Sequence, residues 1–532
     1  MINGLSPPSR FIIAASAAAI LSTWITPFQR DLFVGDETKY GQVVREMRAT
    51  GAVFLPTLNG APFTHKPPLH FWMVNILTIP LGVYSTWAFV LPSLLAFLFL
   101  LWLMSKMGGP MAAFVCATSL MMWGSAQTAR MDVSFTAFIV LGAWMLQRER
   151  LLVAGVAFGV ATLIKGPMAP VIGVVLFLLE WWRLRRSPRG VVPAIAAMAV
   201  IPLLWFVPAM LIGGSAYTRE VIVKQTIGRA ISTWVHNAPP WFYILHLPGI
   251  LFPWFFVAVA ALRGANRFYI NWILAVLIPY SLMSSKLDVY MMAMIPPVAL
   301  MIAGFVEDSR PRLSGQPRAA VLQTLPKVLI LAVLTVPVFF LNTSEAKSLL
   351  IILAVAALLT FVPLLWANRL TLVFLLVVPL LFFFFVRRVP LEAKPLLIIL
   401  AVAAALSLLT WKWEVLSTIA VGIVPLVPIV YAAFTMMPMI NDIGSTRRLI
   451  AAIERQRVAP ESVALYTCPY LWSRDFPRQL ERVRYVDADN IGQPVVIATS
   501  RAHANEIAAT LRNYRHVDQL QMIGKWFDVY RR

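Results

Sequence analysis

Long apolar runs constrain this chain more than any other feature. About fifteen of them recur, and most approach the roughly 20 residues that one helix needs to cross the hydrocarbon core of a bilayer. With 59% hydrophobic and only 13% charged residues, a chain of 532 residues has too little polar surface for a water-soluble globule. The runs lie near residues 10–28, 86–105, 110–127, 131–147, 151–164, 167–182, 191–213, 242–262, 268–284, 289–306, 326–343, 348–366, 370–386, 395–411 and 415–437. The sequence predicts an all-α polytopic membrane protein with about 13 to 15 transmembrane helices, the first of them retained.

The composition changes near residue 440. A helix-like stretch rich in arginine is followed by four short β-type runs, VALYT, RVRYV, PVVIAT and KWFDVY, with a helical stretch at about 502–513 before the last of them. Alternating strands and helices over this length are typical of a small α/β domain. We therefore expect a transmembrane domain over 1–439 and an extracytoplasmic α/β domain over 440–532.

Basic residues set the expected orientation. They number 45 against 24 acidic residues, and 31 of the 45 precede Ile440. We expect cationic residues that flank helix ends to account for most of this excess. The other basic residues could bind a phosphate. The basic run WWRLRRSPRG at 181–190 is expected in the cytoplasm. This places the loops 29–68 and 214–241 and the C-terminal domain outside, with the short apolar segment 69–83 along the membrane surface.

The first outer loop carries the most informative motif, GDETKYGQVVREM. Tyr40, Val43, Val44 and Met47 recur at helical spacing, which predicts an amphipathic helix at the membrane surface. Asp36 at its start has two interpretations. It is a helix N-cap, or it works with Glu37 as a general base or as the group that orients a nucleophile.

A second constellation is His65-Lys66-Pro67-Pro68. Consecutive prolines fix an extended backbone, which would hold the preceding side chains in place. Lys66 is a compact point charge that can bind a phosphate, and its alternative role is that of an interfacial lysine.

Further ionisable residues fall at outer helix ends. Asp132 and Lys165 occupy the ARMDVSF and LIKGP junctions, and because such groups are costly near a membrane we expect them to form an ion pair. Lys286 and Tyr290 form another polar junction, and His236 lies in the other long outer loop.

No cofactor motif emerges from the pattern. His65 and His236 are weak candidates for a divalent metal, since isolated histidines lack metal-site spacing. The two cysteines, Cys116 and Cys468, indicate neither a disulfide framework nor a metal cluster. The sequence also lacks GxxxxGK[ST], GxSxG and a convincing GxGxxG, so nucleotide hydrolysis, a hydrolase elbow and a dinucleotide fold have no motif support.

The first outer loop resembles that of the bacterial lipid A aminoarabinose transferases, which stand with the protein O-mannosyltransferases in the GT-C class of membrane glycosyltransferases. The resemblance rests on GDETKYGQVVREM followed by LNGAPFTHKPPL, and extends through ARMD, KGP, HNAPPWFY and KLDVYMMAMIPP over roughly residues 1–310. One departure is His65, which stands where the family often has an acidic residue.

The resemblance implies an inverting transfer of a sugar from a polyprenyl (undecaprenyl) phosphate donor to a lipid A-like or other envelope acceptor at the outer, periplasmic face of the bacterial inner membrane. Asp36 would be the essential acid near the acceptor nucleophile, with Glu37 beside it and Tyr40 in the substrate site. Lys66 would meet the donor phosphate, next to His65. Asp132 and Lys165 would support these groups as a pair. Lys286 and Tyr290 would line the donor side, and His236 would lie near the cavity.

The pattern is also compatible with two other classes of function, a transporter and a non-catalytic membrane scaffold. A transporter or flippase of a lipid-linked sugar would use the same charges to bind a headgroup, but it should place them near the bilayer midplane rather than at helix ends. A protein Ser/Thr acceptor is an alternative for the transferase. A membrane scaffold would leave both motifs of the first loop without a role. The expected partners are the lipid-linked donor, the acceptor and membrane lipids; no nucleic acid is expected, and the pattern assigns no oligomeric state.

Overall fold

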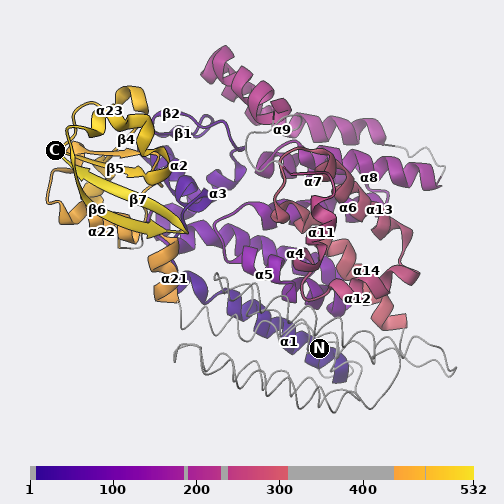
Figure 1. Ribbon diagram of the computed structural model, residues 1–532. Coiled ribbons are helices and arrows are strands. Elements are labelled where there is room, and N and C mark those ends of the chain that lie inside the picture. The colour runs from indigo at the N-terminus through magenta and orange to yellow at the C-terminus, as the bar shows by residue number, and fades with distance from the viewer. Residues whose placement is uncertain (1–6, 185–189, 229–237, 309–436, 474) are drawn as a thin grey trace, which may run out of the picture.

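The computed structural model describes residues 7–184, 190–228, 238–308, 437–473 and 475–532 (Figure 1). The five apolar segments predicted between residues 326 and 437 lie outside the described residues, apart from Met437 at the end of the last one. The remaining ten coincide with helices. The helices described before residue 309 are α1 (Pro7–Thr23), the 3-10 helix η2 (Thr26–Phe28), α2 (Asp36–Thr50), α3 (Leu69–Leu81), α4 (Thr86–Thr118), α5 (Leu120–Ala126), α6 (Asp132–Gln147), α7 (Leu151–Lys165), α8 (Met168–Leu184), α9 (Val191–Arg219), the π-helix η3 (Glu220–Gly228), α11 (Phe242–Ile250), α12 (Phe255–Ala261), the 3-10 helix η4 (Leu262–Gly264), α13 (Arg267–Leu282), the 3-10 helix η5 (Asp288–Met294) and α14 (Ile295–Asp308).

Within the described residues, three helical stretches are long and apolar enough to cross a membrane: Thr86–Thr118, Val191–Gln225 and Asp288–Val306. The apolar stretch expected at 242–262 is not one continuous helix, because α11 and α12 meet at 108°. Pro253 lies between the two helices and has no N–H group to donate to a helical hydrogen bond, which is consistent with a break at this point. The helix expected to end at 213 continues past a kink at Gly214 (φ 70°) into the predicted outer loop.

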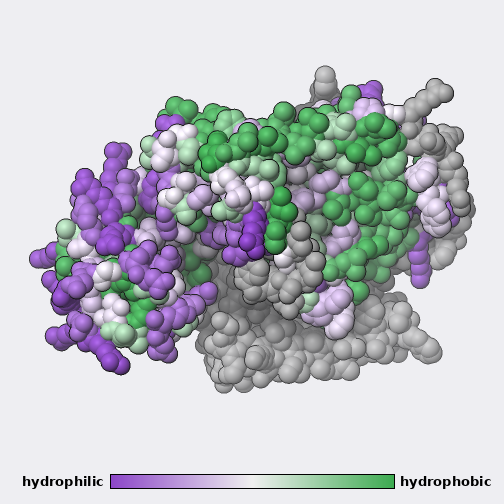
Figure 2. All heavy atoms as spheres, turned by 90° about the horizontal axis from the view of Figure 1, so that it is seen from above, coloured by the Kyte–Doolittle hydropathy of each residue, from purple (hydrophilic) through white to green (hydrophobic). Residues whose placement is uncertain are grey.

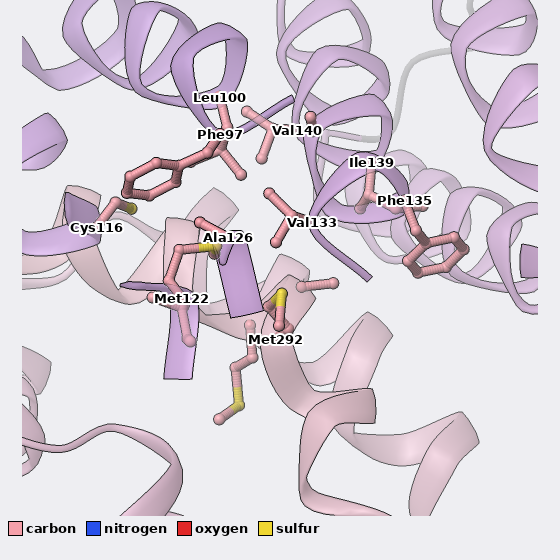
Figure 3. Packing of buried hydrophobic residues seen from close by; sticks show 14 of the residues in the cluster. Phe97, Leu100, Cys116, Met122, Ala126, Val133, Phe135, Ile139, Val140 and Met292 are labelled. Atoms are coloured by element: carbon pink, nitrogen blue, oxygen red, sulfur yellow. The ribbon is translucent and has the colours of Figure 1, made fainter. Parts of the chain in front are cut away.

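The hydrophobic core of the helical part lies where α4, α5, α6 and η5 meet. In Figure 3, Leu100 of α4 lies near Val133 and Val140 of α6, while the ring of Phe97 points toward Cys116, and these side chains are fully buried. The break predicted near residue 108 is a kink inside α4, where Gly109 adopts φ 69°. This core fixes the first residues of α6, which carry Asp132.

Helices α7 and α9 approach each other through small residues. Gly155 and Gly159 of α7 are four residues apart on one face of the helix. A Cβ on Gly155 would lie 2.2 Å from the carbonyl oxygen of Ala194, and one on Gly159 would lie 3.0 Å from Ile201. Such close backbone packing is typical of helix pairs in membranes, where small residues replace the hydrophobic driving force.

The C-terminal part is an α/β sheet domain, α21 (Met437–Gly444) to β7 (Lys525–Arg531). Its five strands run in the order β4-β3-β5-β7-β6: β3 (Val463–Tyr466), β4 (Arg484–Val486) and β5 (Val496–Ser500) are parallel, and β7 and β6 (Arg515–Met522) join antiparallel. α22 (Arg447–Arg455) packs on one face, with Leu449 and Ile453 buried against Val463 and Leu465. The four predicted strands are confirmed. The sequence did not indicate β6, whose side chains are mostly exposed, as befits an edge strand.

The surface of the sheet domain differs in polarity from the surface of the helical part. Figure 2 shows hydrophilic residues gathered over the sheet domain and hydrophobic residues over the helical part. Leu204 and Leu211 of α9, for example, are 69% and 81% exposed. Apolar side chains in such numbers on an outer surface are typical of helices that face lipid. In Figure 1 the sheet domain lies at one end of the helical part, next to α2 and the hairpin β1–β2 (Thr57–Leu58 and Ala61–Pro62).

Candidate active site

Asp36 is the first residue of α2 and lies on the surface of the first loop. Gly35, with φ 117°, takes the N-cap position, and the Asp36 side chain does not cap the helix, so that alternative is not observed. Its carboxylate lies 3.4 Å from Nη2 of Arg130 and 4.0 Å from Nζ of Lys39. With its side chain 36% exposed, Asp36 is accessible to a ligand.

Glu37 points into the protein instead. Its side chain is only 7% exposed and forms an ion pair with the buried guanidinium of Arg30. The backbone N–H of Phe33 donates to Oε2 at 2.8 Å, and that of Ala129 donates to Oε1 at 2.7 Å. Since buried carboxylates need such partners, the geometry fits a group that holds the loop in place. This differs from the catalytic role expected for Glu37.

Asp132 and Lys165 form the predicted ion pair. Lys165 Nζ lies 2.5 Å from Asp132 Oδ1, and both side chains are below 10% exposed. Arg130 Nε donates to Asp132 Oδ2 at 3.0 Å and so joins this pair to Asp36. The ring of Tyr290 lies 4.8 Å from the Lys165 ammonium, a cation–π contact. Asp36, Arg130, Asp132, Lys165 and Tyr290 thus form one continuous row of contacts, called the charged row below.

Arg130 is the residue of this row that was not among the predicted site residues. It stands in the quoted ARMD segment, directly before an apolar helix, where an ionisable residue usually has a specific partner. That signal predicts a pair but cannot name two carboxylates from different parts of the chain. Burial opposes the charge of Arg130, but Asp132 and Asp36 outweigh it and raise the pKa of the guanidinium.

Tyr40 lies one turn after Asp36 on the inner side of α2. It is 3% exposed and packs edge-on against Phe71 and His70 of α3, with ring centroids 5.3 and 6.1 Å away. Burial, together with the nearby Asp36 carboxylate, raises the pKa of the phenol well above its ordinary value. Tyr40 is therefore a neutral group that fixes α2 against α3 close to the charged row.

Glu46, at the other end of α2, holds the hairpin that precedes Lys66. Its carboxylate accepts hydrogen bonds from Thr57 Oγ1 at 2.7 Å and from the N–H groups of Asn59 and Gly60 at 2.7 and 3.1 Å. Asn59 and Gly60 both have positive φ, as a tight two-residue hairpin turn requires. The Leu-Asn-Gly part of the motif is thus a turn anchored on α2.

His65 and Lys66 lie between this hairpin and α3, both half-buried. The His65 ring packs edge-on against Phe63, with centroids 5.2 Å apart. Leu69, which begins α3, contacts the buried cluster around Trp205 and Tyr217 of α9. Lys66 is therefore held between elements that are themselves packed, as the prolines after it suggest.

Lys286 is engaged with the backbone. Its ammonium is buried and donates to the carbonyl oxygens of Ala238, at 2.9 Å, and Met283. Tyr290, four residues later, stacks on Tyr280 with centroids 5.2 Å apart. Of the two residues expected on the donor side, Tyr290 reaches the charged row, whereas Lys286 closes the junction after α13.

Only one of the two weak metal candidates, His65, belongs to the described part of the chain. No group of three or more His, Cys, Asp or Glu side chains suited to a metal occurs among the described residues. His236 lies outside them. Cys116 and Cys468 are unpaired.

Comparison with known structures defines the fold. Two crystal structures of ArnT from Cupriavidus metallidurans match the chain over nearly its full length. The structure bound to undecaprenyl phosphate has a TM-score of 0.66, 18% identity and 97% coverage of both chains. The apo structure has a TM-score of 0.68, 17% identity, and coverage of 99% of this chain and 98% of that one. The chain has the fold of this GT-C membrane glycosyltransferase.

The relatives found by sequence comparison carry the name of the same kind of enzyme. A protein of Edwardsiella ictaluri named undecaprenyl phosphate-alpha-4-amino-4-deoxy-L-arabinose arabinosyl transferase is 26% identical over 327 residues, which are 54% of this chain and 57% of that protein. The protein of the same name from Pectobacterium carotovorum is 28% identical over 53% of this chain and 56% of its own length. The chain thus spans little more than half the length of these relatives. No family model matches. The predicted resemblance to lipid A aminoarabinose transferases is confirmed.

Proposed function

We propose that this protein is an inverting membrane glycosyltransferase that moves a sugar from a polyprenyl-phosphate donor to a lipid A-like or other envelope acceptor. The observation that carries the proposal is the charged row, in which one accessible carboxylate, Asp36, is backed by two cations and a second, buried carboxylate. The similar fold and the names of the relatives support the choice of donor and acceptor.

The expected reaction needs both signs of charge. An acceptor oxygen attacks the anomeric carbon, and the bond from this carbon to the phosphate oxygen of the donor breaks, with the electron pair leaving on the phosphate. Positioned cations stabilise that developing charge. Lys66 is our candidate for the donor phosphate, with His65 beside it, and Tyr290 lines the same side.

Asp36 is assigned to the acceptor. Its carboxylate can accept the proton of an acceptor hydroxyl, or orient an acceptor phosphate that needs no deprotonation. Arg130 and Lys39 hold the carboxylate on either side. Asp132 and Lys165 keep Arg130 in place, while Glu37 and Tyr40 fix the start of α2.

We place the site at the outer, periplasmic face of the bacterial inner membrane, as the basic run at 181–190 indicates. The sheet domain contacts the first loop, which supports placing both on that side. A resident metal is not part of the proposal, because the acid–cation contacts supply the charges that the reaction needs.

Asp36, Asp132 and Lys165 lie at helix ends, the first residues of α2 and α6 and the last residue of α7. A transporter of lipid-linked sugars would carry such groups near the middle of its helices. The position of the charged row therefore favours the transferase.

Mass spectrometry of envelope lipids, glycans and glycoproteins tests the proposal, in cells that lack the gene and carry wild type, Asp36→Asn or a control. Glu461→Gln, which changes an exposed acid of the sheet domain, is the matched control. We expect one sugar modification to return with wild type and Glu461→Gln but not with Asp36→Asn. Full restoration by Asp36→Asn, or accumulation of the donor on the cytoplasmic side, would favour the transporter.

A further inference from the structure

The segment that leads into Asp36 is attached to the sheet domain rather than only to the helices. Asn441 of α21 accepts a hydrogen bond from the N–H of Asp31 at 3.0 Å and donates to the carbonyl of Gln29 at 2.6 Å. The N–H of Val34 donates to the carbonyl of Gly444 at 2.8 Å. Three backbone groups within six residues are thus fixed by the sheet domain.

An ion pair strengthens this attachment. The Asp31 side chain is fully buried and accepts hydrogen bonds from Nε and Nη2 of Arg447, the latter at 3.2 Å from Oδ1. A two-point guanidinium–carboxylate contact fixes direction as well as distance. Arg447 is the first residue of α22, the helix that packs on the sheet.

The loop between Asp31 and Asp36 is short and closed on itself. Glu37 binds back to Arg30 and to the N–H of Phe33, so the segment 30–37 is tied at both ends. Because the segment is tied at both ends, a displacement of Asp31 should be transmitted to Asp36 rather than absorbed by the residues between them.

A second contact lies beyond Asp36. Trp472 of the sheet domain is 2% exposed and belongs to the hydrophobic core of the helical part. It covers Gly41 of α2 so closely that a Cβ on Gly41 would lie 2.9 Å from Trp472 Cδ1. The backbone of Trp472 is held by Thr446, which precedes Arg447, through hydrogen bonds of 2.7 and 2.8 Å.

We propose that the sheet domain is a structural part of the active site, and that Arg447 is a positioning residue that sets Asp36 through Asp31. The inference rests on the proposed transferase function. Arg447 itself does not touch the charged row; it acts on the segment that carries the acid. Because a displacement of about 1 Å at a reacting group can cost on the order of a hundredfold in rate, loss of this contact should appear in kcat.

The test compares Arg447→Ala with Arg455→Ala in the purified full chain. Arg455 lies on the same helix and pairs with Asp518 of β6 at 2.6 Å, so its loss removes an arginine of α22 without touching the first loop. We expect Arg447→Ala to lower kcat about tenfold to a hundredfold with the donor KM unchanged, and Arg455→Ala to match wild type. Arg447→Lys, which keeps the charge but not the two-point contact, should restore part of the rate.

A labelling experiment reads the position of the loop without activity. Leu32 is fully buried, so Leu32→Cys, in a chain with Cys468→Ser, should react with a maleimide slowly. Adding Arg447→Ala or Asp31→Asn should speed this reaction, and adding Arg455→Ala should not. Wild-type kcat and unchanged labelling in Arg447→Ala would overturn the inference. If the wild-type chain transfers no sugar, the proposed function is wrong. The labelling experiment would then still decide whether Arg447 holds the loop.

Discussion

Glu37→Gln and Asp36→Asn separate the roles of two adjacent acids. Glu37 accepts from Arg30 and from two backbone N–H groups, so all of its neighbours are donors. A glutamine offers a single acceptor oxygen, and its NH₂ group would face a donor. Arg30, whose side chain is 3% exposed, would also lose the charge that balances it.

The two substitutions should therefore differ in cost. Removing one partner of a buried ion pair typically costs about 3 to 5 kcal/mol, and we expect Glu37→Gln to lie near the lower figure because one acceptor remains. The Asp36 carboxylate lies 3.4 and 4.0 Å from its two cations, and these side chains are 31% to 36% exposed, so Asp36→Asn should cost less than about 1 kcal/mol.

This difference can be measured by thermal unfolding of the purified proteins in detergent, with tryptophan fluorescence as the signal. A transfer assay on the same proteins measures their activity. We expect a clearly lower apparent Tm for Glu37→Gln, with residual transfer in the folded fraction. Asp36→Asn should unfold like wild type and transfer no sugar. If Glu37→Gln unfolds like wild type but is inactive, Glu37 takes part in the chemistry and our assignment is wrong.

Three further predictions follow from the same contacts. Lys66→Ala should raise the donor KM by about tenfold or more with a small change in kcat, since a charge-assisted hydrogen bond to phosphate contributes on the order of 2 kcal/mol; unchanged donor affinity would reassign Lys66 to the interface. Gly155→Ala should lower the apparent Tm, because its Cβ would lie 2.2 Å from the Ala194 carbonyl oxygen, whereas Gly124→Ala, with open space, should unfold like wild type if this packing is the cause. The hydrogen bond from Arg501 lowers the pKa of Asp528, so this carboxylate stabilises the sheet domain above about pH 4 and loses its effect as the pH falls through the lowered value. The difference in Tm between wild type and Asp528→Asn should accordingly be largest at neutral pH and shrink below about pH 4, and a constant difference would contradict this origin.

Local patterns were sufficient for the main elements. Apolar periodicity predicted α2, and apolar length predicted most of the helices up to residue 306, because lipid selects both directly. It did not predict the bend between α11 and α12 or the continuation of α9 past Gly214. The alternation at VALYT and PVVIAT gave β3 and β5, since strands buried on both faces are continuously apolar. The cost of isolated charges near lipid predicted the pair of Asp132 and Lys165.

The sequence by itself therefore determined most of the described helices, four of the five strands of the sheet domain, and the residue types that the site would need. Only the tertiary structure decided that Glu37 turns inward while Asp36 stays accessible, because this depends on Arg30 and the N–H of Ala129, far apart along the chain. The same holds for Arg130, which joins carboxylates from two elements, and for Arg447, which pairs with an aspartate 416 residues away. Apolar patterns select a face of a helix or strand, but the partner of a charged side chain is chosen by where the folded elements meet.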